Sequence, residues 1–169
     1  MSLTDLLDPS VRIVVAGTIA AWHRAEQEHY YAGAGNQFWY LLHASGLMPE
    51  QLQPADDHRL PAFGIGLTDL VRTRRSEPGE PPVFDVRGFH KRIRRCAPDV
   101  VAFVSKTAAS SYARAAGERL PREHGALSWQ VAGVPAFVLP GPSGANNGMP
   151  LPLRTAMWAD LLDYLETLA

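Results

Sequence analysis

Apolar residues in this chain occur in short runs that alternate with longer segments of helical spacing. Four short runs, rich in β-branched and aromatic residues, are typical of buried strands: residues 11–17, 63–71, 99–105 and 134–140. Segments with an apolar residue every three or four positions predict helices at 36–46, 86–96, 106–117 and the C-terminus. Strands that alternate with helices indicate a parallel sheet covered on both faces. We therefore predict an α/β fold: one domain, residues 1–169, with three α/β/α layers around a four-stranded, mainly parallel sheet.

Local signals mark the ends of several predicted helices. Asn36 and Asp85 stand where a side-chain oxygen can cap a first turn. Gly117 stands where a left-handed C-terminal cap is expected. In the last helix, the apolar stripe expected to face the core is Leu153, Met157, Leu161, Leu165 and Leu168.

The loops after three of the strands form the candidate functional site. In open α/β sheets, ligands bind at the carboxyl ends of the strands. The loops at 17–35, 69–82 and 140–152 follow strand ends and are the richest in Gly, Pro, Asn and charge. The pattern alone thus locates the site before any motif is considered.

Composition limits the chemistry and the partners. The single cysteine, Cys96, provides neither a disulfide nor a cysteine-ligated metal cluster, and this fits a reducing compartment. We find no apolar run of the roughly 20 residues that a membrane span needs. The N-terminus lacks a basic leader and an apolar signal core, so we expect a cytoplasmic protein without membrane association.

Positive charge is concentrated in one part of the chain. The net charge is −1, but eight of the 16 Lys and Arg residues lie between positions 71 and 95. Such a cluster is consistent with a local anion-binding face, or simply with a solvated helix face and a charged loop. Charge alone favours the second interpretation.

Several common catalytic signatures are absent from the sequence. We find no phosphate-binding loop ending in Lys-Ser or Lys-Thr, no GxGxxG after the first strand, and no HExxH among the six histidines. Ser143 lies in GPSG, which differs from the GxSxG nucleophile elbow. We therefore predict no metal and no cofactor.

Four segments together match one known family. They are AGTIAAW after the first strand, YYAGAGNQFW before the next helix, GIGLTDLV at the second strand and VLPGPSGANN after the fourth. In order and approximate spacing, this set resembles the mismatch-specific uracil and thymine DNA glycosylase branch of the uracil-DNA glycosylase superfamily. The resemblance runs from about Val11 to the final helix and implies that family's fold, DNA as partner and removal of a base.

The resemblance assigns roles around a base that is flipped out of the duplex. The family places an aromatic ring at the position of Tyr31, stacked on that base. Small residues from Ala32 to Gly35 would let backbone amides approach the base edge. Base-binding residues are therefore expected to be Tyr31, Gly17, Thr18 and Ala32. Phe38 and Trp39 are expected to pack in the core.

The sequence departs from the family at the positions that usually carry the reaction. The family's water-positioning Asn aligns with Ile19, and Gly141 replaces the Asn of the second motif. Two other residues remain as catalytic candidates: Asp69, whose carboxylate would stabilise an oxocarbenium-like sugar and activate water, and Asn36 at the helix start. Asp69 is equally consistent with a turn or cap, and Asn36 with a helix cap. His23 and His29 lie in the same loop.

DNA contacts are expected from two loops. Phosphate contact is expected from Arg72, Arg74 and Arg75, and contact within the duplex from Ser143, Gly144, Ala145 and Asn146; Ala145 is shorter than the family's wedge residue. The remaining cations of this region are expected on a solvated helix face: Arg87, Lys91, Arg92, Arg94 and Arg95.

The sequence leads to one functional hypothesis and two alternatives. The hypothesis is a monomeric, monofunctional DNA glycosylase that removes uracil, hypoxanthine or mismatched thymine from double-stranded DNA by water attack at C1′. Lys91 and Lys106 lie outside the site loops, which argues against Schiff-base chemistry. The alternatives are a catalytically degenerate paralogue that only binds DNA and an α/β enzyme that acts on a small molecule.

Overall fold

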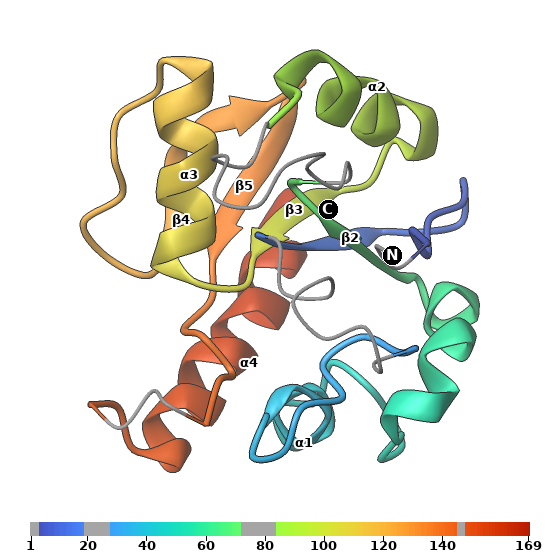
Figure 1. Ribbon diagram of the computed structural model, residues 1–169. Helices are drawn as coiled ribbons and strands as arrows, with labels where there is room; N and C mark the ends of the chain where they lie inside the picture. The colour runs from blue at the N-terminus through green and yellow to red at the C-terminus, as the bar shows by residue number, and fades with distance from the viewer. Residues whose placement is uncertain (1–3, 19–27, 72–83, 145–147) are drawn as a thin grey trace, which may run out of the picture.

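The computed structural model describes residues 4–18, 28–71, 84–144 and 148–169. Within these residues, the strands are β1 (Ile13–Gly17), β2 (Ile65–Asp69), β3 (Val100–Phe103), β4 (Gly125–Val131) and β5 (Val134–Val138). The helices are α1 (Phe38–Ala44), α2 (Val86–Cys96), α3 (Lys106–Ala116), α4 (Leu151–Leu168) and a 3₁₀-helix, η2 (Pro54–Phe63). The strands form one sheet in the order β2-β1-β3-β5-β4 (Figure 1).

The sheet is mainly parallel, as predicted. β1 pairs in parallel with β2 on one side and with β3 on the other, and β3 pairs in parallel with β5. Flanking helices cover both faces, so the predicted α/β fold is confirmed. Because β1, β2 and β3 run in the same direction, their carboxyl ends lie together at one edge of the sheet.

The predicted number of four strands is wrong, because β4 adds an antiparallel fifth strand beside β5. The residues of β4 alternate: Trp129 and Val131 are buried, whereas Ser128 and Gln130 are exposed. The two-residue turn Ala132–Gly133 has φ values of 50° and 82°, the left-handed geometry that closes tight hairpins. A strand with one exposed face has only half of its positions apolar, so the search for continuous apolar runs missed it.

Each face of the sheet has its own hydrophobic core. Successive side chains of a strand point to opposite faces. Ile13 and Val15 of β1 pack with α1 and α4, which lie below the sheet in Figure 1. Val14 and Ala16 pack on the opposite face with α2, at the top of Figure 1, and α3, at its left. These two cores produce the three α/β/α layers.

The helix-end signals are largely confirmed. The Asp85 carboxylate accepts a hydrogen bond from the Gly88 N–H at 3.0 Å at the start of α2. Gly117 ends α3 in the left-handed region, with φ of 75°. In α4 the predicted stripe is wrong at its ends, since Leu153 and Leu168 are exposed. Its buried residues are Arg154, Trp158 and Leu161.

The segment before β1 covers the outer edge of the sheet. Leu6 and Leu67 exchange two backbone hydrogen bonds of 2.9 and 3.0 Å, an isolated antiparallel bridge on the free side of β2. This segment crosses directly over Gly66. A side chain at Gly66 would meet the Leu6 carbonyl oxygen at 2.9 Å and Leu7 Cδ2 at 2.7 Å. The glycine in β2 is therefore required for close backbone approach rather than being a sign of a weak strand.

We expect Gly66→Ala to destabilise the fold by about 1–3 kcal/mol, because the added methyl group must displace a backbone carbonyl as well as a side chain. Urea unfolding measures the change. Gly148→Ala is the matched control, since a methyl group there meets no described atom within 4 Å. Equal stability of the two variants would mean that the N-terminal segment does not hold this position.

Candidate active site

The ends of β1 and β2 form the base of the candidate site. Gly17 and Asp69 are register partners at the last position of the two strands. The pairing continues beyond them, since the Leu70 N–H donates to the Gly17 carbonyl at 2.8 Å and the Val71 N–H to the Thr18 carbonyl at 3.1 Å. Asp69 is only 5% exposed. The backbone pairing before and after Asp69 therefore fixes the position of this residue.

Gly17 lets the Asp69 and Tyr31 side chains converge. A methyl group on Gly17 would lie 2.7 Å from Asp69 Oδ1 and 3.1 Å from the Tyr31 hydroxyl. Both oxygens thus lie over the same stretch of backbone at the carboxyl end of β1. The structure brings together three of the residues that the sequence assigned to the site.

Tyr31 has an unusual backbone and a buried hydroxyl. Its φ of 52° lies in the left-handed region, which is uncommon for a bulky residue and typical of positions held by their surroundings. One face of its ring stacks on Phe38, with a centroid distance of 4.0 Å and an interplanar angle of 20°. The hydroxyl is inaccessible to solvent and has no hydrogen-bond partner among the described residues. A buried hydroxyl without a partner is uncommon in folded proteins.

The surroundings of Tyr31 oppose its ionisation. Burial is the main cause that raises the pKa of the Tyr31 hydroxyl well above its usual value of 10.0, and the negative charge of Asp69 raises it further, with Tyr30 adding to the effect. Tyr31 is therefore a neutral hydrogen-bond donor across the physiological pH range.

A buried aspartate that the sequence analysis did not identify holds the approach to Tyr31. Asp57 of η2 is 6% exposed and accepts from the Tyr30 N–H at 3.0 Å, while its other oxygen lies 3.3 Å from His29 Nδ1. The Trp39 indole N–H donates to the Tyr30 carbonyl at 3.2 Å. His29 thus contacts Asp57, and the chain entering Tyr31 is anchored from two elements.

The predicted cap at Asn36 is wrong, because α1 begins at Phe38 and its N-cap residue is Gln37, which makes no side-chain capping hydrogen bond. Asn36 lies one residue before the N-cap, and its Oδ1 accepts from the Phe38 N–H at 2.9 Å. Phe38 and Trp39 are buried, as predicted. Because Oδ1 is occupied by the backbone, Asn36 has its Nδ2–H group to offer a ligand.

The loop after β5 packs directly on the loop before α1. The Gln37 N–H donates to the Pro142 carbonyl at 2.8 Å. A methyl group on Gly144 would lie 2.8 Å from the Gly35 carbonyl oxygen, so only glycine allows this contact. The segment 33–37 and the segment 141–144, more than 100 positions apart in the sequence, therefore form one wall beside Tyr31.

Two side chains of α4, missed by the sequence analysis, support that wall. The Trp158 indole N–H donates to the Pro140 carbonyl at 2.9 Å. Arg154, 8% exposed, directs Nη1 to the Gly141 and Ser143 carbonyls, each at 3.4 Å. The available signal was the helical spacing that Arg154 shares with Trp158 and Leu161, the other buried residues of α4. A prediction based on apolar residues alone leaves out a charged residue at such a position.

The other predicted site residues have different environments. Thr18 lines a cavity of about 420 Å³ that also contacts α3, and Ala32 is partly buried beside Tyr31 in the chain. Several predictions lie outside the described residues: Ile19, His23, Arg72, Arg74, Arg75, Ala145 and Asn146.

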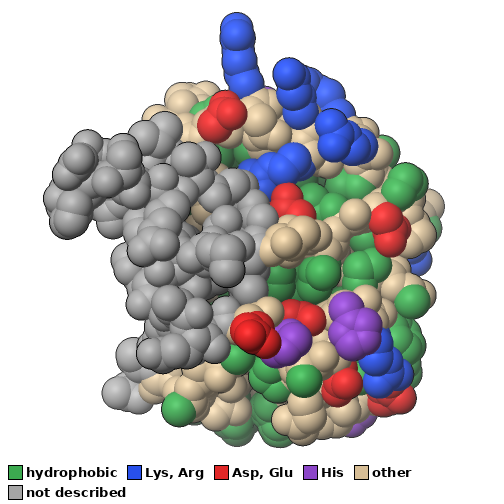
Figure 2. All heavy atoms as spheres, turned by 45° about the vertical axis from the view of Figure 1, so that its right-hand side comes forward, with side chains coloured by type: hydrophobic (Ala, Val, Ile, Leu, Met, Phe, Trp, Pro, Cys, Tyr) green, Lys and Arg blue, Asp and Glu red, His purple; other side chains and the backbone are tan. Residues whose placement is uncertain are grey.

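The cations of α2 follow the prediction with one exception. Figure 2 shows Lys and Arg side chains gathered at the top of the molecule, over α2, where Arg87, Lys91, Arg94 and Arg95 are exposed. Arg92 was expected on the same solvated face, and this prediction is wrong. Its side chain is only 20% exposed and pairs with Asp5 at 3.0 Å, because it lies on the side of α2 that faces the sheet.

In the described part of the chain, no three His, Cys, Asp or Glu side chains are close enough to hold a metal ion. None of its helices combines the length and the apolar character needed to cross a membrane.

Comparisons with known proteins agree with this architecture. The family model of the uracil DNA glycosylase superfamily matches residues 4–163. The solution NMR structure of a candidate uracil DNA glycosylase from Methanosarcina acetivorans superimposes with a TM-score of 0.63 at 20% sequence identity, covering 97% of this chain and 96% of that one. At this identity, the structural match supports the fold alone, whereas the family match covers almost the whole chain.

We expect Tyr31→Phe to reduce the loss of stability at alkaline pH. The unfolded tyrosine ionises near its usual pKa of 10.0 and the folded one only well above it, so the wild type loses stability as pH rises beyond 10.0. Urea unfolding across this pH range measures the slope. Tyr40→Phe, at an exposed ring, is the control. An identical slope in wild type and Tyr31→Phe would show that the Tyr31 hydroxyl ionises freely.

Proposed function

The chain belongs to the uracil DNA glycosylase superfamily, and from this premise we propose that it is a monofunctional DNA glycosylase. Its substrate is double-stranded DNA with a deaminated base: uracil first and hypoxanthine second, with mismatched thymine as a further candidate. Water attacks C1′, the N-glycosidic bond breaks, the base leaves with the bonding electrons, and an abasic site remains. We further propose a monomer that acts in the cytoplasm, at the nucleoid if the source is bacterial.

The observation that carries the proposal is the convergence of Asp69 and Tyr31 over Gly17. Negative charge stabilises a sugar that becomes oxocarbenium-like, and a pocket wall is needed to hold the extruded base. Asp69 Oδ1 and the Tyr31 hydroxyl both lie close to Gly17 at the carboxyl edge of the sheet. That edge is where ligands of open α/β sheets bind.

We assign general-base and electrostatic roles to Asp69. A carboxylate accepts a proton from water and stabilises the cationic sugar, whereas the isoleucine at position 19 can do neither. Burial of Asp69 lowers the local dielectric constant and strengthens its interaction with a nearby cation. The carboxylate thus substitutes for the amide that relatives use.

We assign base recognition to Asn36 and Tyr31. The Asn36 oxygen is engaged by Phe38, so its remaining Nδ2–H donor suits a carbonyl oxygen, such as those of uracil and hypoxanthine. Phe38 covers one face of the Tyr31 ring, and we propose that the extruded base stacks on the opposite face. Gly17, Thr18 and Ala32 would complete the surroundings of the base.

The duplex is proposed to lie along the loops at the same edge. Gly144 packs on Gly35 and the Pro142 carbonyl accepts from the Gln37 N–H, and these contacts support the proposal that the loop with Ser143 lies beside the base pocket. Arg72, Arg74 and Arg75 remain candidates for phosphate contact on the sequence pattern alone.

We expect Asp69→Asn to lower the single-turnover cleavage rate of a uracil-containing duplex by about 10²-fold or more, because the variant keeps the shape of the side chain but loses the carboxylate that acts as general base. Duplex affinity should change little. Asn36→Ala should alter the preference among uracil, hypoxanthine and thymine more than the rate. Saturating enzyme and alkaline strand scission measure these rates, with the exposed Asp163→Asn as control.

The outcomes separate the competing assignments. Full activity in Asp69→Asn with loss in Asn36→Ala would transfer catalysis to Asn36. A wild type that binds duplexes but cleaves none of these bases would favour the degenerate, binding-only alternative. Absence of both binding and cleavage would favour the small-molecule enzyme.

We expect Tyr31→Ala to reduce turnover by roughly 5- to 150-fold, the equivalent of the 1–3 kcal/mol that base–aromatic stacking contributes. Tyr31→Phe retains the stacking ring and should stay near wild type. Tyr40→Ala, at an exposed ring on α1, is the control, and thermal midpoints identify any general loss of folding. An active Tyr31→Ala would place the base elsewhere.

A further inference from the structure

The Arg92 side chain reaches from α2 to the end of β2. Its Nη1 donates to Asp5 Oδ2 at 3.0 Å and to Thr68 Oγ1 at 2.7 Å. The Thr68 hydroxyl donates in turn to Asp5 Oδ1 at 2.6 Å. Helix, strand and N-terminal segment thus meet in one polar cluster, the clamp, formed by Asp5, Thr68 and Arg92.

The clamp also contacts the backbone of Asp69. Arg92 Nη1 and Nη2 both donate to the Asp69 carbonyl, at 3.3 and 3.2 Å. Thr68 and Asp69 are successive residues of β2, so their side chains point to opposite faces of the sheet. The guanidinium therefore holds the peptide of Asp69 from the face of the sheet opposite to the proposed catalytic carboxylate.

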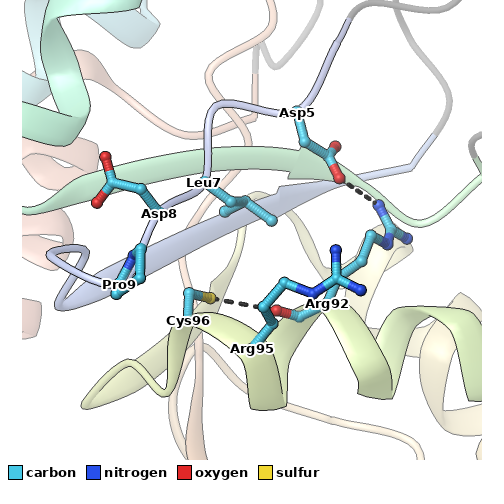
Figure 3. Close-up of a pocket in the computed structure, with 7 residues that line it drawn as sticks. All are labelled: Asp5, Leu7, Asp8, Pro9, Arg92, Arg95 and Cys96. Carbon is cyan, nitrogen blue, oxygen red and sulfur yellow. Dashed lines mark hydrogen bonds and ion pairs between the residues drawn. The ribbon is translucent and has the colours of Figure 1, made fainter.

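The setting of the clamp gives it rigidity. Thr68 is fully buried, and the Arg92 and Asp5 side chains are 20% and 19% exposed. The Arg92 guanidinium also lies 5.3 Å from the centre of the Phe89 ring. Figure 3 shows the Asp5–Arg92 ion pair among the residues that line a pocket of about 340 Å³ between the N-terminal segment and α2.

Resting on the proposed function, we infer that Arg92 is a positioning residue for the reaction, acting through the peptide of Asp69 from the opposite face of the sheet. Nη1 and Nη2 both donate to the Asp69 carbonyl, and Nη1 also donates to the Thr68 hydroxyl, so the guanidinium restricts rotation of the strand end. A displacement of about 1 Å at a reacting group can cost 10²-fold in rate, so a modest loosening of this peptide is enough to matter. Asp5 and Thr68 share this role by holding the guanidinium.

The test replaces Arg92 by lysine, which keeps the charge opposite Asp5 but lacks the planar fork of donors. We expect Arg92→Lys to lower the single-turnover rate by about 10- to 100-fold, with the duplex Kd within about 2-fold of wild type. Arg94→Lys, an exposed position on the same helix, is the matched control and should match wild type. An unchanged rate in Arg92→Lys overturns the inference.

A double-mutant cycle distinguishes positioning from a general structural role. If Arg92 acts through Asp69, adding Arg92→Lys to Asp69→Asn should change the residual rate by no more than about 2-fold. The same loss in both backgrounds would overturn the inference, since Arg92 would then act independently of the carboxylate.

Amide hydrogen exchange provides a readout that does not depend on cleavage. The Leu70 and Val71 amides, bonded just beyond Asp69, should exchange faster in Arg92→Lys, whereas those of Val14 and Val15 in the centre of β1 should not change. Unchanged exchange at Leu70 and Val71 would overturn the inference that the clamp fixes the end of β2. A wild type without cleavage overturns the proposed function instead, and exchange alone then decides whether Arg92 fixes the strand end.

Discussion

The parallel pairing of β1 with β2 is the constraint on which the candidate site depends. Its register places Asp69 beside Gly17, and the backbone bonds of Leu70 and Val71 extend it past the strand ends. A shift of one residue would turn Asp69 to the other face of the sheet and bring Thr68 into the site. The Leu6–Leu67 bridge and the close approach at Gly66 hold this register from the outer edge.

The residues in the site are held by others that lie outside it. Asp57 of η2 fixes the chain that enters Tyr31, and Trp158 and Arg154 of α4 hold the loop that packs on Gly35. These supports come from η2 and α4, two elements that are far apart in the sequence. Together they explain how Tyr31 can keep a left-handed backbone, because several independent contacts determine its conformation.

A carboxylate in place of an amide changes the electrostatics of such a site. Asp69 adds a negative charge that disfavours ionisation of Tyr31, so the pair forms an acceptor and a neutral donor side by side. The acceptor suits water and a cationic sugar. In the proposed function, Asp69 thus takes the role for which the sequence resemblance leads us to expect an amide.

The sequence alone determined the features that depend on local periodicity. Apolar runs and helical spacing are set by neighbouring residues, and they predicted the parallel strands, the helices and the edge of the sheet where Asp69, Tyr31 and Asn36 lie. The family's motifs, read in order, named the superfamily that the comparison confirms.

Tertiary structure decided what depends on partners distant in the chain. The exposed face of β4 prevented the prediction of that strand. The assumption that charged residues are exposed placed Arg92 in solvent and overlooked Arg154. Both side chains lie against the fold and donate to backbone carbonyls. A sequence pattern cannot show that a charged side chain has a buried partner, because the partner comes from another element. Only folding brings Asp5, Thr68 and Arg92 together, since they are separated by up to 87 positions, and a hydrogen bond requires that proximity.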